Sequence, residues 1–190
     1  MAGWESLKAV LEVVELFEEL EIPYHVGGSL ASSVHGLPRQ TNDLDLVADL
    51  PMAVAPILVL RLQERFYIDA ESIRRAIQRR SSFNLVHLAT GFKVDVFVAG
   101  RGRFDRMELA RHGAHHLEGL EREVVVKSAE DTVLRKLEWF RLGGEVSDRQ
   151  WNDILGIVRT QGDRLDREYL REWAGNLGID DLLERALGFT

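Results

Sequence analysis

Residues 27–45 read GGSLASSVHGLPRQTNDLD, and this stretch decides which fold we expect. Its glycine pair follows Tyr24–Val26, a short run typical of a strand, and therefore marks a turn out of that strand. Ser29 is a good N-cap for a short helix expected over Leu30–His35. Because glycine has no side chain, the backbone of such a turn can approach a phosphate group closely. The amides that open the following helix point towards the same phosphate.

The end of the stretch alternates polar and apolar residues from Asp43 to Leu46, which is the periodicity of a strand. Asp43 and Asp45 then project from one face, where their oxygens suit Mg²⁺. A third carboxylate, Asp95, lies in the second β-rich run, Lys93–Val98. Each feature has a plain alternative when taken alone, because glycine turns are common and an edge strand with a solvated face also alternates. Their joint occurrence favours a metal and phosphate site.

The flanking sequence predicts an α+β fold, a mixed β-sheet flanked by helices and followed by a C-terminal helical bundle. We place the boundary after residue 127, which gives an α/β core over 1–127 and a helical region over 128–190 packed on that core. The elements expected around residues 27–45 are a helix over Trp4–Leu20, a helix from Pro51 to about Phe66, a basic helix near Glu71–Arg80, a hairpin of Phe83–Ala89 with Lys93–Val98, a strand over Glu123–Lys127, and helices from Ser128 to Phe140, Asp148–Thr160, Asp166–Leu177 and Asp180–Leu187.

The overall composition narrows the class of protein. The chain has 190 residues, of which 45% are hydrophobic, so it contains enough apolar side chains for a sizeable core. Cysteine is absent, which excludes disulfides, thiolate metal sites and a thiol nucleophile. The N-terminus lacks a signal-peptide pattern and no apolar run is long enough to cross a bilayer, so we expect a cytoplasmic protein without a membrane partner. The net charge of -7 argues against a general nucleic-acid coat.

The pattern of Gly-Gly-Ser, a short helix, Arg-x-Thr-x-Asp-x-Asp and a later strand aspartate resembles the nucleotidyltransferase superfamily that includes DNA polymerase β and the CCA-adding enzymes. Within that superfamily it looks most like the toxin-type nucleotidyltransferases of bacterial type IV toxin–antitoxin, or abortive infection, systems. The resemblance is strongest over Ile22–Val98. It implies a nucleotidyltransferase-type sheet and transfer of a nucleoside monophosphate from an NTP to an acceptor hydroxyl. The acceptors left open are a tRNA end, another RNA, a protein hydroxyl or a small molecule, of which a tRNA is preferred; the resemblance also implies a cognate antitoxin protein as a partner.

The resemblance also implies roles for individual residues. The metal, Mg²⁺ or Mn²⁺, would be held by Asp43, Asp45 and Asp95, and Asp95 would be the general base. The residues expected to contact the NTP or its phosphates are Gly27, Gly28, Ser29, Arg39 and Thr41. For Arg39, a plain loop charge or a role in orienting the Asp pair is an alternative, and for Thr41 a turn-capping role is the plainer interpretation.

The resemblance extends more weakly into the helical region. There Lys136 would contact phosphate, and Asp153 would orient either Lys136 or the base. The segment around Asp153 departs from the toxin pattern, because Asp148 and Arg149 stand in reversed order and Gln150 replaces an aspartate. This departure keeps a rival hypothesis open: the chain is a catalytically inactive nucleotide-binding or protein-interaction module with the same fold.

Three further clusters have structural and functional interpretations. Arg74, Arg75, Arg79 and Arg80 form either a solvated helix face or a landing patch for RNA. The histidines between positions 112 and 116 lack a carboxylate partner in any metal motif, so we do not predict a metal site there. Trp139, Trp151 and Trp173 fall among apolar neighbours at helical spacing and are predicted to lie in the core.

Overall fold

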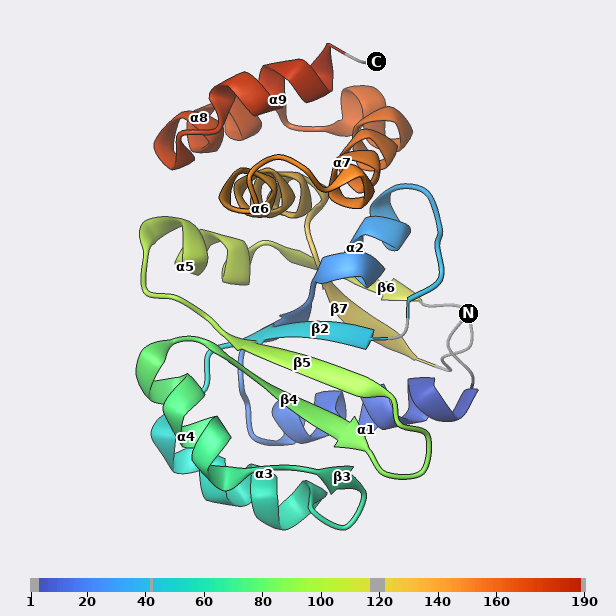
Figure 1. Cartoon of the computed structure of the whole chain (residues 1–190), viewed down its shortest axis with the longest axis vertical. Coiled ribbons are helices and arrows are strands. Elements are labelled where there is room, and N and C mark those ends of the chain that lie inside the picture. Colours follow the sequence, from blue (N-terminus) through green and yellow to red (C-terminus); the bar gives the residue numbers. More distant parts are fainter. Residues whose placement is uncertain (1–3, 42, 117–121, 189–190) are drawn as a thin grey trace.

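The computed structural model describes residues 4–41, 43–116 and 122–188 (Figure 1). In these residues the strands form a seven-stranded mixed sheet in the order β3-β4-β5-β2-β1-β7-β6. The strands are β1 (Tyr24–Val26), β2 (Asp43–Ala48), β3 (Phe66–Tyr67), β4 (Ser82–His87), β5 (Lys93–Val98), β6 (His112–His116) and β7 (Glu123–Lys127).

The sheet places β2 between β5, its parallel partner, and β1, its antiparallel partner. Strand β4 extends the sheet beyond β5 as the expected hairpin, and β7 runs parallel to β1 on the other side. The aspartates of β2 are therefore in the middle of the sheet. The alternative of a solvated edge strand is wrong, because both sides of β2 are hydrogen-bonded to other strands.

One face of the sheet packs on α1 (Trp4–Glu19), α3 (Ala55–Leu62) and α4 (Ala70–Arg79), the helices below the sheet in Figure 1. The alternation in β2 sends Leu44, Leu46 and Ala48 into this layer, where they join a buried apolar cluster. The residues between them in sequence point to the opposite face. A period of two residues in the strand thus separates the core from the candidate site.

The opposite face carries the other helices: α2 (Gly28–His35), α5 (Arg103–Ala110), α6 (Ala129–Leu142), α7 (Asp148–Gln161), α8 (Arg167–Leu177) and α9 (Asp180–Leu187). Helices α6 to α9 enclose a second apolar cluster, which Phe104 of α5 joins. Short 3₁₀ turns over Met52–Val54 and Gly162–Arg164 complete the secondary structure of the described residues. None of the described helices has the length and apolarity needed to cross a bilayer.

The structure confirms the α+β plan and corrects several details. The helix expected from Pro51 to Phe66 ends at Leu62, and Phe66 lies in β3 instead. Helix α2 begins at Gly28, with Gly27 at the N-cap position, so the prediction that Ser29 caps it is wrong. Helix α5 and strand β6 were not predicted from sequence, because neither has a strong apolar period.

Candidate active site

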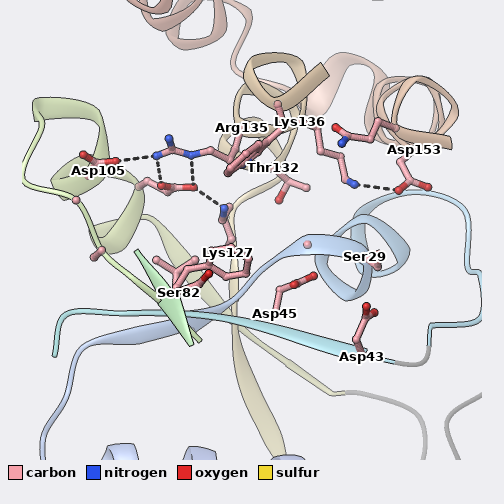
Figure 2. Close-up of a pocket in the computed structure, with 18 of the residues that line it drawn as sticks. Ser29, Asp43, Asp45, Ser82, Asp105, Lys127, Thr132, Arg135, Lys136 and Asp153 are labelled. Atoms are coloured by element: carbon pink, nitrogen blue, oxygen red, sulfur yellow. Dashed lines mark hydrogen bonds and ion pairs between the residues drawn. The ribbon is translucent and has the colours of Figure 1, made fainter. Parts of the chain in front are cut away.

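The three predicted metal-binding aspartates lie on adjacent strands. In the parallel pairing of β2 with β5, Asp45 is directly opposite Asp95, and Asp43 is opposite Lys93. Facing residues of paired strands project to the same side of a sheet, so all three carboxylates belong to the face covered by α2 and α6. Figure 2 shows Asp43 and Asp45 pointing up from β2 into the space beneath these helices.

Charge repulsion and burial act together on Asp45. Burial is the largest cause that raises the pKa of its carboxyl group, and the charges of Asp43 and Asp95 raise it further. A backbone hydrogen bond from Ser29 acts in the opposite direction. Asp95 is partly neutralised, because Lys93 Nζ lies 2.7 Å from its Oδ2. The site therefore concentrates negative charge on partly buried carboxylates, an arrangement that a bound cation relieves.

The glycine turn fits closely over Asp45. Gly28 has a φ of +52°, and a Cβ atom added there would lie 1.7 Å from Asp45 Oδ2. Both observations restrict this position to glycine, because the left-handed backbone and the carboxylate each exclude a side chain. The turn thus brings the first turn of α2 against the carboxylates, as the sequence predicts for a phosphate-binding turn.

Arg39 and Lys136 meet on Asp153. Arg39 Nε donates to Asp153 Oδ1 at 2.9 Å, and Lys136 Nζ donates to Asp153 Oδ2 at 2.9 Å. Arg39 also donates to the hydroxyl of Ser29. Residues from α2, the following loop, α6 and α7 therefore join in one cluster beside the aspartates (Figure 2). Thr41, at the end of the same loop, donates to Asp43 Oδ1 at 2.7 Å and so orients that carboxylate.

The charges of this cluster compensate one another. Burial raises the pKa of Asp153, but the hydrogen bonds from Arg39 and Lys136 outweigh it and leave that pKa below its usual value. For Lys136, burial lowers the pKa and exceeds the opposing effect of Asp153. An anion placed beside Lys136 favours its charged form, so this lysine is suited to a phosphate group.

A cavity of about 820 Å³ unites these groups. Its lining is made of Gly28, Ser29, Arg39, Asp43, Asp45, Val47, Arg80, Ser81, Ser82, Phe97, Val98, Ala99, Gly100, Asp105, Glu108, Lys127, Thr132, Arg135, Lys136, Trp139, Ser147, Arg149, Gln150 and Asp153. The volume is in the range of pockets that take small molecules and cofactors. Asp95, Gly27 and Thr41 are absent from this lining, although Asp95 shares the strand face of Asp45.

A buried ionic network, which the sequence did not predict, lies at the other end of the cavity. Lys127 and Arg135 both donate to the carboxylate of Glu108, and Arg135 also donates to Asp105 at 3.0 Å (Figure 2). Glu108 is only 3% exposed. Burial alone would raise its pKa, but Lys127 and Arg135 overcome this effect and lower the pKa to about 2. The i, i+3 spacing of Asp105 and Glu108 was the only local signal of this network.

The carboxylate oxygens at the site are suitable ligands for a divalent cation, but they are not close enough together to form a complete metal site. Among the described residues, no group of three His, Asp or Glu side chains is close enough together to hold a metal ion. The fit rests on Asp43, Asp45 and Asp95, whose oxygens share one strand face and whose charges repel one another.

No protein-family model and no curated protein matches the sequence. Solved structures do match. The antibiotic-resistance factor ANT(2'')-Ia has a TM-score of 0.56 at 14% identity, covering 98% of each chain. A nucleotidyltransferase-like protein from Paracoccidioides brasiliensis also has a TM-score of 0.56, at 18% identity over 97% of this chain and 93% of its own.

A third match is the lincosamide antibiotic adenylyltransferase LnuA, solved with lincomycin bound. It has a TM-score of 0.51 at 15% identity, covering 80% of this chain and 94% of its own. Identities this low establish a shared architecture rather than a shared substrate. The sheet, the glycine turn over paired aspartates and the C-terminal helices therefore identify the chain as having the nucleotidyltransferase fold.

Proposed function

We propose that this chain is a divalent-metal-dependent nucleotidyltransferase that moves a nucleoside monophosphate from an NTP to an acceptor hydroxyl. The observation that carries the proposal is the register of β2 and β5. It sets Asp45 opposite Asp95 beneath the glycine turn at Gly28. Shared fold alone would not support an activity, whereas carboxylates next to a glycine turn suited to phosphate support this one.

Each residue has a role in this reaction. Asp43, Asp45 and Asp95 would hold Mg²⁺ or Mn²⁺, which supplies neutralisation of phosphate charge. The Gly28 and Ser29 backbone would cradle the phosphates. Lys136 would neutralise phosphate charge at the same end of the cavity, held in place by Asp153.

The reaction exchanges one P–O bond for another. The acceptor oxygen bonds to the α-phosphorus, the bond from that phosphorus to the bridging oxygen of the β-phosphate breaks, and pyrophosphate leaves. The proton of the acceptor hydroxyl passes to Asp95. In the structure Asp95 is paired with Lys93. Asp95 becomes neutral when it accepts the proton, so its ion pair with Lys93 is lost at this step.

Beyond the reaction itself, we also propose the chemical class of the acceptor. Our preferred class is RNA, specifically a tRNA, with the chain acting as the toxin of a toxin–antitoxin pair. Support comes from Arg80, which lines the cavity directly after α4, the helix that carries Arg74, Arg75 and Arg79. The second class is a small hydroxylated antibiotic, because one ANT(2'')-Ia structure contains adenylyl-2''-tobramycin.

The test is label transfer from radiolabelled NTPs in Mg²⁺, with total RNA and a panel of hydroxylated antibiotics as separate acceptors. We expect Asp45→Asn to reduce transfer at least about 100-fold, on the scale of losing one charge-stabilising group. Asp163→Asn removes a fully exposed carboxylate outside the cavity lining and should leave transfer unchanged. NTP binding without transfer to any acceptor would contradict the enzyme and favour the inactive nucleotide-binding module.

A further inference from the structure

Trp139 is exposed where the sequence analysis predicted a core residue. Its side chain is 52% exposed, whereas Trp173 is 3% exposed in the helical cluster. Trp139 also lines the cavity that contains Asp45 and Lys136. The prediction of a buried Trp139 is therefore wrong, and the side chain instead forms part of the wall of the candidate site.

The spacing of residues along α6 explains this exposure. Thr132, Arg135, Lys136 and Trp139 recur at i, i+3, i+4 and i+7, the spacing of one helix face, and all four line the cavity. The opposite face of α6 supplies Val133, Leu134, Leu137 and Phe140 to the apolar cluster. Trp139 is thus the one aromatic residue on the polar face of this helix.

Trp139 has no partner within the part of the chain that the structure describes. Among residues 4–41, 43–116 and 122–188, no other ring stacks on its indole, no cation covers it and no hydrogen bond reaches its side chain. By contrast, Trp151 packs against Phe140 and lies under Arg185. A large aromatic face at a cavity wall without an intramolecular partner is suited to a planar ligand.

We propose that Trp139 stacks on the nucleobase of the bound NTP. This inference rests on the proposed function. Lys136 precedes Trp139 by one helical turn, so the phosphate-binding and stacking residues project side by side from α6. Arg149, on the facing end of α7, lines the same cavity and has no ion-pair partner among the described residues, so the subsite offers an aromatic face beside uncompensated positive charge. Because every base has a π-face, this contact holds the nucleoside without choosing the base.

The experiment measures binding of ATP and of inorganic triphosphate by calorimetry in Mg²⁺. Base–aromatic stacking is strong enough that Trp139→Ala should weaken ATP binding roughly tenfold. Triphosphate has no base, so its affinity should be unchanged. Trp139→Phe should keep most of the ATP affinity. The control is Leu142→Ala, which removes an apolar side chain that is 71% exposed on the same helix but outside the cavity lining.

Different outcomes separate the two proposals. If wild type and Trp139→Ala bind ATP equally, the stacking role is wrong while the proposed function stands. An equal loss of ATP and triphosphate affinity would also overturn stacking, because it would indicate a disturbed phosphate site. Tryptophan-dependent ATP binding without nucleotidyl transfer would retain the inference and contradict the enzyme. Failure of the folded wild type to bind ATP would overturn both.

If Trp139→Ala does not fold, the tryptophan fluorescence of the wild type and of Trp139→Phe provides a second measurement. Bound ATP should quench part of the tryptophan fluorescence of the wild type, and this part should be missing in Trp139→Phe. Persistence of the full quenching in Trp139→Phe would overturn the proposal.

The exposed Leu142 and Val146 lie close in sequence to Trp139 and offer another use for it, a protein-docking patch. Unchanged ATP affinity in Trp139→Ala would favour that use.

Discussion

Gly28 shows how one residue connects backbone geometry with chemistry. Its positive φ and the absence of a Cβ let the turn lie directly over Asp45. A larger residue would have to move the turn or the carboxylate, because Asp45 Oδ2 would be 1.7 Å from the added atom. Glycine at position 28 is therefore required by the position of the aspartate, and not only by the turn itself.

We expect Gly28→Ala to lower the free energy of unfolding by about 1–3 kcal/mol, the usual cost of a strained backbone position. It should also abolish Mg²⁺-dependent ATP binding, because the substitution displaces Asp45. Urea denaturation and calorimetry measure the two effects. Gly175→Ala is the matched control, since a Cβ there would meet nothing within 4 Å and alanine is favoured inside α8. Wild-type affinity in Gly28→Ala would show that the close approach is unnecessary.

At the level of secondary-structure elements, ion pairs as well as apolar packing join α5 to α6. Glu108 of α5 accepts hydrogen bonds from Lys127 of β7 and Arg135 of α6. When one member of a buried ionic network is removed, the remaining charges have no partner. The resulting loss of stability is larger than the net stability that the intact network contributes. The network therefore fixes how α6 presents Lys136 to the cavity.

Glu108→Gln should lower the free energy of unfolding by about 3–5 kcal/mol at pH 7. Because the pKa of Glu108 is depressed to about 2, its contribution is present above the usual value of 4.5 and is lost as pH falls through 2. The difference between variant and wild type should accordingly shrink between pH 4.5 and pH 2, as measured by urea denaturation. Glu71→Gln, which removes an exposed carboxylate 4.0 Å from Arg74, should change stability by less than about 1 kcal/mol. A constant difference across this pH range would contradict the assignment.

At the scale of the whole molecule, two apolar clusters enclose a polar layer. One cluster lies between the sheet and α1, α3 and α4, and the other lies within α6 to α9. The cavity is between them, because β2 and α6 each turn an apolar face away from it. A ligand that contacts both β2 and α6 would therefore link the elements that carry the two apolar clusters.

The domain boundary predicted after residue 127 falls in a connected part of the structure. Arg135, beyond the boundary, donates to the carboxylate of Glu108, and Arg39 Nε donates across it to Asp153 Oδ1 at 2.9 Å. Gln161 of α7 donates to the carbonyl of His35 at 2.6 Å. We therefore expect one cooperative urea transition, with circular dichroism and tryptophan fluorescence reporting the same midpoint. Two separated midpoints would favour independent units over 1–127 and 128–190.

The sequence by itself determined strands β1, β2, β4, β5 and β7, the glycine turn and the shared face of Asp43 and Asp45, because these depend on local periodicity and on the conformational freedom of glycine. The roles expected for Lys136 and Asp153 came from the family resemblance. In the structure Lys136 Nζ lies 2.9 Å from Asp153 Oδ2. Only the tertiary structure decided that Glu108, Lys127 and Arg135 form a network and that Trp139 faces a cavity. Local spacing cannot determine these features, because each depends on which elements far apart in the chain pack against one another.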